Sequence, residues 1–395
     1  MKKLIFLISF FSYSGYYAGL AIILSLNLSE LSRFYSVPIR VVMALLMIII
    51  IHRHKNLLIK NKNSHYIILF IVFWVFYLLK VLYTESITTN NELRRIWYEY
   101  PLFAFLYIIM PFLAFYSIDF YKYKKIILNG FISSGFILGL VSLFLYGKYL
   151  VQGIGRLNLV RYQTGEEVLS PLALSYSGAL TIVLCIYKFV ILKEKNKLQI
   201  LYLSSTIILS FIMFLLGSSR GSVIALMLTL PLFLIYSPIK QKFGLIFLSI
   251  LSTPVIIWAL EASGSSIFTR MGNTIEDKGG GRESLWKNAF MHFIEHPIFG
   301  GKIEIGGIYP HNIILEILMA TGILGTILIS PVIIKGFKLG IENLRYDKTN
   351  LFVILIMIQG LTQHLFTAGF YTSTLLFVPL AILFSLSKKN LQYEN

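Results

Sequence analysis

The chain has 395 residues, of which 56% are hydrophobic and only 13% carry a charge. About one quarter of the residues of a soluble domain are charged, so this composition excludes an ordinary soluble protein and is typical of an integral membrane protein. The formal net charge of +17 does not indicate nucleic-acid binding, because the basic residues are spread over short loops between apolar runs. The single cysteine, Cys185, lies within an apolar run, which excludes both a disulfide framework and a cysteine-based metal site.

Apolar runs of about the length of a membrane span follow one another along the chain. The first run comes directly after Met1 and two lysines. It is as long as a spanning helix and lacks a good cleavage site, so we interpret it as a span and not as a signal peptide. The runs predict an all-α integral membrane protein with about 12 transmembrane helices in a single domain, residues 1–395. They lie near residues 4–24, 37–51, 66–83, 101–117, 126–146, 169–192, 200–218, 222–236, 243–261, 312–334, 350–368 and 370–387.

The distribution of lysines indicates how these helices cross the membrane. When the N-terminus is placed in the cytoplasm, 20 of the 35 basic residues fall in short cytoplasmic loops or at the termini, as the positive-inside rule requires. We therefore expect a multi-pass protein with both termini in the cytoplasm. The outer face then carries the loops 25–36, 84–100, 147–168 and 262–311, together with the segment Ser218–Arg220. Chemistry in these segments takes place where ATP and nucleotide sugars are absent.

The principal outer loop, residues 262–311, is too short to form an independent domain with its own core. Within it, apolar residues recur at helical spacing from Glu283 to His296 and predict a short amphipathic helix that Pro297 ends. We expect this helix to lie in the plane of the membrane interface. Its apolar face is formed by Leu285, Trp286, Ala289, Phe290, Phe293 and Ile294, and its polar face by Lys287, Asn288, His292 and Glu295.

Two arginines are candidates for binding an anionic ligand. Arg220 lies between Ser219 and Gly221, whose small side chains leave its guanidinium accessible. The alternative is a membrane anchor that extends toward water, but an outward arginine lacks a role in topology, so we favour ligand binding. Arg282 follows the run Gly279–Gly281 at the start of the amphipathic helix, where glycine N–H groups and the helix dipole attract an anion. Its planar guanidinium can bind phosphate through two hydrogen bonds. The alternative is a solvated arginine in a flexible loop.

His311 is the candidate general base. It lies between Pro310 and Asn312 at the start of a span, and histidine is the side chain best suited to accept a proton near neutral pH. We expect Asn312 to cap the helix and thereby to fix the direction of the imidazole. The alternative is a structural histidine at the membrane interface, in which case Glu304, Glu316 or a loop carboxylate is the next candidate for the base.

A second histidine pattern, His292-Phe293-Ile294-Glu295-His296, has the H-x-x-E-H spacing of a zinc protease. We do not interpret it as a metal site, because Pro297 follows at once and no soluble domain surrounds the helix. Other polar residues of the outer face either line a glycan groove or belong to solvated loops. They are Arg94-Arg95, Arg156, Arg161, Glu166-Glu167 and Gln363-His364.

Four motifs in series resemble the O-antigen ligase and polymerase superfamily. They are Ser218-Ser219-Arg220-Gly221, then Gly280-Gly281-Arg282-Glu283-Ser284-Leu285-Trp286, then His296-Pro297-Ile298-Phe299-Gly300-Gly301, and Pro310-His311-Asn312 followed by Glu316, Gly322 and Gly325. In order and spacing they cover residues 200–330, and the layout of spans extends the resemblance over the whole chain. The resemblance implies a membrane-embedded, C-type glycosyltransferase that inverts the anomeric centre and needs neither a metal ion nor a cofactor.

The same resemblance implies the substrates and the roles of individual residues. The donor is a glycan linked to undecaprenyl diphosphate, and the acceptor is a sugar hydroxyl at the periplasmic face of the bacterial inner membrane. Arg220 and Arg282 are carried over as ligands of the diphosphate, and His311 as the residue that activates the acceptor. We expect further substrate contacts from Ser219, Gly281, Tyr309, Asn312 and His364.

The family contains both polymerases, whose acceptor is another lipid-linked repeat, and ligases, whose acceptor is the lipid A-core. The motifs occur in both, and we favour an O-antigen polymerase because polymerases of this kind are the more numerous. A chain-length regulator is an expected partner of a polymerase. A transporter of lipid-linked glycans without chemistry is the alternative from another class, but it is expected to show inverted repeats or ion pairs at mid-membrane. The sequence has no evident repeat of this kind.

Overall fold

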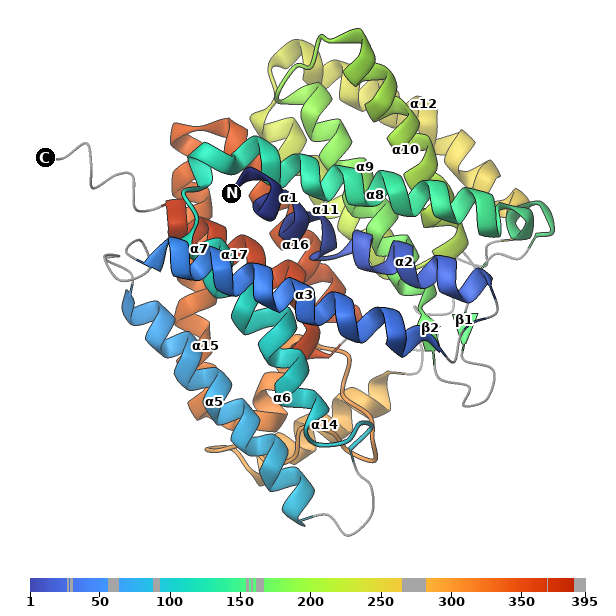
Figure 1. The fold of residues 1–395 in the computed structure, drawn as a ribbon. Helices are drawn as coiled ribbons and strands as arrows, with labels where there is room; N and C mark the ends of the chain where they lie inside the picture. Colours follow the sequence, from blue (N-terminus) through green and yellow to red (C-terminus); the bar gives the residue numbers. More distant parts are fainter. Residues whose placement is uncertain are drawn as a thin grey trace, which may run out of the picture. The chain divides into compact units, whose positions relative to one another are not determined.

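Figure 1 shows the fold in a computed structural model, which describes residues 1–26, 28, 31–55, 64–87, 93–153, 156–157, 159–160, 167–264, 282–367 and 369–386. The described part of the chain is predominantly α-helical, which confirms the expected class of an all-α integral membrane protein. The chain forms two compact units. Unit 1 comprises Met1–Leu46, Tyr123–Gly272 and Tyr346–Thr362, and unit 2 comprises Met47–Lys122, Asn273–Arg345 and Gln363–Asn395.

The helices follow the apolar runs predicted from the sequence. Within the described residues, nine helices are long and apolar enough to cross a membrane, which confirms a multi-pass membrane protein. Six of them are α3 (Ser32–Arg53), α5 (Ser64–Ile87), α8 (Phe120–Val151), α9 (Pro171–Val190), α10 (Lys197–Gly217) and α12 (Ile239–Ala262). The others are α15 (Ile313–Tyr346), the stretch made of α6 (Glu99–Ala104), the π-helix η2 (Phe105–Ile109) and α7 (Met110–Ser117), and the stretch made of η3 (Lys348–Asn350) and α16 (Leu351–Phe366).

The remaining three runs are also helical. The first forms a bent pair, α1 (Lys2–Phe11) and α2 (Ser14–Ser25), with an angle of 61° between the two helices. The other two are shorter apolar helices, α11 (Arg220–Tyr236) with 17 residues and α17 (Thr374–Leu386) with 13 residues. Every predicted run therefore has a helical counterpart, whereas the crossing of the membrane by these shorter helices stays a prediction.

A small strand pair, which the sequence analysis did not predict, follows α8. The strands β1 (Leu159–Val160) and β2 (Glu167–Leu169) are antiparallel. Strands of this length carry too few residues for an alternating pattern to be recognised.

In unit 1, α9 packs along α10 with the two backbones in close contact. A side chain on Gly178 of α9 would place its Cβ 2.4 Å from the carbonyl oxygen of Ser210 in α10. Glycine is therefore required here, because only a residue without a Cβ allows this approach.

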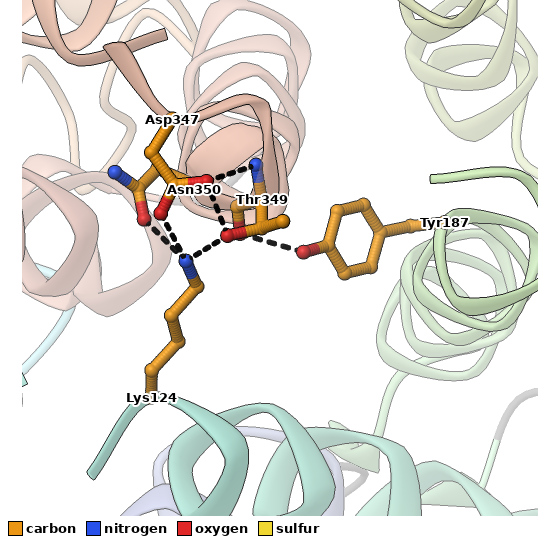
Figure 2. Close-up of polar contacts among 5 residues, drawn as sticks. All are labelled: Lys124, Tyr187, Asp347, Thr349 and Asn350. Carbon is orange, nitrogen blue, oxygen red and sulfur yellow. Dashed lines mark hydrogen bonds and ion pairs between the residues drawn. The ribbon is translucent and has the colours of Figure 1, made fainter. Parts of the chain in front are cut away.

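Figure 2 shows a polar cluster of unit 1 in which Lys124 of α8 reaches the turn before α16. Its Nζ donates hydrogen bonds to Asp347 Oδ2 at 2.9 Å, to Asn350 Oδ1 at 2.7 Å and to Thr349 Oγ1. The hydroxyl of Tyr187 in α9 donates to the carbonyl oxygen of Thr349 at 2.6 Å. Burial acts to raise the pKa of Asp347, but hydrogen bonds from Thr349 and Lys124 outweigh it and hold that pKa below its usual value. The cluster thus joins α8 and α9 to the start of α16.

Unit 2 has an aromatic core. Trp74 of α5 stacks on Phe370 of the 3-10 turn η4 (Phe370–Thr372), with ring centroids 4.9 Å apart and an interplanar angle of 11°. Phe70 stacks on Phe112 of α7 at 4.0 Å. These rings fix α5, α7 and the turn that precedes α17 against one another.

The long helix α15 is interrupted at Gly322, whose backbone has φ 61° and ψ −157°. The groups that lose their helical partners bind instead to the loop 297–301, which precedes Gly322 by about twenty residues in the sequence. The N–H groups of Ile323 and Leu324 donate to the carbonyls of Pro297 and Ile298 at 2.8 and 3.1 Å, and Gly301 N–H donates to the carbonyl of Met319 at 2.9 Å. We call this arrangement the Gly322 joint. It satisfies backbone groups that would be costly to leave without partners inside a membrane.

Candidate functional site

The predicted base, His311, lies in a turn of unit 2 that is fixed on both sides. Its φ of 53° is in the left-handed region, where a side chain is strained and where functional residues are enriched. On one side, Asn312 Oδ1 accepts hydrogen bonds from Ile314 N–H at 3.0 Å and Leu315 N–H at 3.3 Å, which confirms that Asn312 caps α15. On the other side, Trp286 Nε1 donates to the carbonyl of Pro310 at 3.0 Å. These bonds fix the backbone on both sides of His311.

The chemical state of His311 follows from its surroundings. The ring lies 4.4 Å from the ring of Tyr309, between centroids, and its Nδ1 is buried without a hydrogen-bond partner among the described residues. Burial lowers the pKa of His311, and the positive charges of Arg282 and Arg94 lower it further, to about 4. The imidazole is therefore neutral at physiological pH, as a general base must be.

Arg282 is placed beside the His311 turn by the amphipathic helix. The helix α14 (Glu283–Glu295) confirms the predicted segment, and Arg282 is the residue before it. The carbonyl of Arg282 accepts a hydrogen bond from the N–H of Trp286 at 2.9 Å, and Trp286 in turn binds Pro310. The half-buried Arg282 and His311 therefore belong to one structural element of unit 2.

The predicted division of α14 into an apolar and a polar face agrees with the structure at most positions, with His292 as the exception. Ala289 is buried, and Phe290 and Ile294 of the predicted apolar face are 48% and 52% exposed. His292, placed on the polar face by its spacing, is half-buried, and its Nε2 accepts a hydrogen bond from the N–H of Lys302 at 2.8 Å. His292 thus contacts the following loop, and sequence periodicity alone does not indicate this contact.

The zinc-like spacing does bring three side chains together. The ligand atoms of His292, Glu295 and His296 all lie within 4.8 Å of one another. However, Nε2 of the neutral His292 ring accepts the Lys302 N–H, so Nδ1 carries the proton and lies 3.8 Å from a Glu295 carboxylate oxygen. Neither nitrogen of His292 is then available as a metal ligand, and we interpret His292 as a residue that fixes the loop.

Glu304 and Glu316, the alternative candidates for the base, are both buried in unit 2. Glu304 Oε2 accepts a hydrogen bond from the backbone N–H of Arg94 at 2.7 Å. Burial raises the pKa of Glu304, and this hydrogen bond partly opposes the rise. Glu316 Oε1 accepts hydrogen bonds from Phe370 N–H at 2.8 Å and from the hydroxyl of Tyr77 at 3.2 Å. An acidic residue within a largely apolar stretch indicates a buried carboxylate with hydrogen-bond partners, because burial without partners is costly.

Unit 1 contains the other predicted cation. The helix α10 ends at Ser218, whose backbone is in the left-handed region with φ 41°. The next helix, α11, begins at Arg220, which is half-buried. Ser219 is buried, and its backbone N–H donates to Ser175 Oγ at 3.2 Å. Ser175 Oγ also lies 2.6 Å from Ser222 Oγ. This serine cluster fixes the turn that carries Arg220, and the first turn of a helix favours a bound anion.

The structure therefore gathers only some of the predicted residues. Arg282, Tyr309, His311 and Asn312 lie in connected turns of unit 2, and His364 is buried in the last turn of α16. Ser219 and Arg220 lie in unit 1. The predicted positions Gly279, Gly280, Gly281, Arg161 and Glu166 are outside the described residues.

Fold and site together define a multi-pass α-helical membrane protein in which a neutral histidine and Arg282 lie in connected turns of unit 2. Residues 205–330 match the O-antigen ligase family, and the match includes Arg220, Arg282 and His311. This match supports the resemblance to the O-antigen ligase and polymerase superfamily that the sequence motifs predicted. The matched family implies a glycosyltransferase-type enzyme and suggests lipid-linked glycans as substrates. A search of curated proteins finds no match to the chain.

Proposed function

We propose that the protein transfers a glycan from undecaprenyl diphosphate to the hydroxyl of an acceptor sugar at the periplasmic face of the bacterial inner membrane. The observation that supports this most directly is the His311 turn. A neutral imidazole is fixed by Trp286 and Asn312, and the charge of Arg282 acts on it. A base beside a cation is what the reaction needs, because a proton is removed while a diphosphate leaves.

In the proposed reaction, His311 accepts the proton of the acceptor hydroxyl while that oxygen forms a bond to the anomeric carbon of the donor sugar. The bond from this carbon to the diphosphate oxygen breaks, and its electron pair leaves with undecaprenyl diphosphate. Attack from the face opposite the leaving group inverts the anomeric centre, and His311 then releases the proton to water. Arginine side chains stabilise the negative charge on the diphosphate, so the reaction balances without a metal ion or a nucleotide.

Arg282 and Arg220 are proposed as ligands of the diphosphate. For Arg282 the support is its link through Trp286 to the His311 turn. For Arg220 the support is the family match, which includes it, and its half-buried position at the start of α11. Tyr309 and Asn312 are the proposed sugar contacts nearest to His311, and Ser219, Gly281 and His364 are proposed substrate contacts without a described link to it.

We favour polymerisation, with a second lipid-linked repeat as acceptor and a chain-length regulator as partner. Ligation to the lipid A-core uses the same groups on a different acceptor and is the second candidate. The proposed orientation, with both termini in the cytoplasm, follows from the distribution of lysines and supplies the donor from the periplasmic leaflet.

The test is glycan transfer by the purified protein in nanodiscs, with an undecaprenyl-diphosphate-linked repeat as donor, no nucleotide and EDTA present. Two acceptors are compared, a second lipid-linked repeat and the lipid A-core. We expect chain growth on the first acceptor, and product on the lipid A-core alone would identify a ligase. His311→Ala should abolish transfer and leave donor binding largely unchanged. A wild-type protein that moves the donor between leaflets and transfers nothing would instead be a transporter.

A further inference from the structure

Two adjacent arginines, Arg94 and Arg95, precede α6 and differ in their surroundings. The guanidinium of Arg95 forms an ion pair with Glu99 at 3.4 Å and lies 5.1 Å from the ring centre of Phe103. Arg95 therefore has a structural role in attaching this segment to α6. The side chain of Arg94 is exposed and has no ion pair or hydrogen bond among the described residues.

The backbone of Arg94, by contrast, is firmly attached. Its N–H donates to Oε2 of Glu304, a residue that is 1% exposed. A buried acceptor of this kind fixes the position of the residue that binds it, because leaving a buried carboxylate unbound is costly. The exposed guanidinium therefore extends from an ordered anchor and not from a freely moving loop.

Glu304 connects this anchor to the His311 turn. Residues Ile305 and Ile308 pair through two hydrogen bonds of 3.0 and 3.2 Å, and Gly306 and Gly307 between them both have positive φ. This is a two-residue hairpin of the type I′ kind, in which the residues just outside the pair, Glu304 and Tyr309, are cross-strand neighbours. The ring of Tyr309 lies 4.4 Å from that of His311. Arg94 is thus joined to His311 through Glu304 and Tyr309.

We infer that Arg94 is a further anion-binding residue of the His311 site and that, with Arg282, it binds the phosphate groups of the lipid-linked donor. This inference rests on the proposed function. It adds Arg94, from the segment that precedes α6, to the residues that bind the donor. It is supported by electrostatics, because the charges of Arg94 and Arg282 both lower the pKa of His311. Two arginines that act on one site repel each other when it is empty, and a bound diphosphate removes that repulsion.

The test is the affinity of the full-length protein in nanodiscs for undecaprenyl diphosphate without a glycan, with undecaprenyl monophosphate as the comparison. Arg94→Gln should weaken binding of the diphosphate at least tenfold, and the monophosphate, which has fewer oxygens to bind, should lose less. Arg94→Lys should recover part of the affinity, because it restores the charge but not the fork. The matched control is Arg345→Gln, which removes the same charge at an exposed position in the last turn of α15 and should change the affinity less than threefold.

The outcomes separate this inference from the proposed function. If the wild-type protein binds undecaprenyl diphosphate and transfers glycan, while Arg94→Gln retains wild-type affinity, the assignment of Arg94 is wrong and the function stands. Absence of both binding and transfer by the wild type would overturn the function itself. Thermal unfolding of each variant distinguishes lost affinity from lost fold. As a second variant, Glu304→Gln retains an acceptor for the Arg94 N–H, so near-wild-type affinity is expected, whereas Glu304→Leu removes that acceptor and should weaken binding as Arg94→Gln does.

Discussion

The indole N–H of Trp286 donates to the carbonyl of Pro310 at 3.0 Å and so joins the amphipathic helix to the turn that holds His311. We predict that Trp286→Phe, which keeps an aromatic ring and removes this bond, lowers kcat by about fivefold, as expected for one hydrogen bond of ~1 kcal/mol. The control is Trp258→Phe in α12, where the indole is 68% exposed. Equal rates for both variants would show that the bond does not position His311.

The pH dependence of the reaction should reflect the environment of His311. Only the neutral imidazole accepts a proton, and the pKa of His311 is lowered to about 4, so kcat/KM should be constant from about pH 6 to 8 and fall toward pH 4. Arg282→Gln removes a charge that lowers this pKa, so the acid limb should move to higher pH. If kcat/KM instead falls near the ordinary histidine pKa, and Arg282→Gln does not shift that fall, this description of the site is wrong.

The two arginines of the family motifs should not tolerate lysine. Arg220→Lys and Arg282→Lys keep the charge and lose bidentate binding, so each should reduce transfer more than tenfold, or at least ~1.4 kcal/mol of activation free energy. Membrane insertion and thermal unfolding should resemble those of the wild type. Arg345→Lys, at an exposed position in the last turn of α15, is the control and should transfer normally. Wild-type rates in the first two variants would identify both arginines as membrane anchors.

The Gly322 joint should be intolerant of any side chain. Gly322→Ala forces a residue with a Cβ into φ 61° and places that atom 2.5 Å from the N of Gly300. We predict a loss of stability of at least about 1–3 kcal/mol, measured by thermal unfolding in detergent. Gly244→Ala in α12, where nothing lies within 4 Å of the added atom, should be neutral or stabilising by up to about 1 kcal/mol. Similar unfolding of the two variants would mean that the joint is not as described.

The orientation in the membrane can be tested by cysteine labelling. Cysteines at Asn273 and Lys302 should react with an impermeant thiol reagent in whole cells once any outer membrane is permeabilised, and a cysteine at Asn196 should not. The background is low because the native Cys185 is buried. Labelling at 196 together with protection at 273 would invert the topology and remove the proposed site from the periplasm.

The course of the helices could be predicted because a spanning helix must be apolar along its whole length. The cap at Asn312 and the segment that became α14 are local features, and the sequence analysis identified both. The Gly322 joint is different, since its hydrogen bonds come from residues 297–301. Gly300, Gly301 and Gly322 are prominent in the motifs, but no local rule indicates that they meet.

The candidate site shows the same limit. The chemistry of His311 and Arg282 is evident from residue type and from the family motifs, whereas the left-handed backbone of His311 is not, because non-glycine residues rarely adopt it. Arg94 and Glu304 are 210 residues apart, and a hydrogen bond between them requires the completed fold. The difference between Arg94 and Arg95 likewise depends on the partners of each side chain, which two adjacent identical letters cannot distinguish.

The Gly322 joint is formed by hydrogen bonds between backbone groups alone. It therefore depends on the length of the loop 297–301 and not on which exposed side chains the loop carries. Ile298 and Phe299 are 61% and 58% exposed, although the carbonyl of Ile298 belongs to the joint. Substitutions at these two positions would alter the surface near the site while the hydrogen bonds to α15 remain in register. Removal of a single residue from 297–301 would shift that register and separate the loop from the helix. Engineering of this protein can therefore vary the side chains at 298 and 299, provided that the length of the loop and its glycines at 300 and 301 are kept.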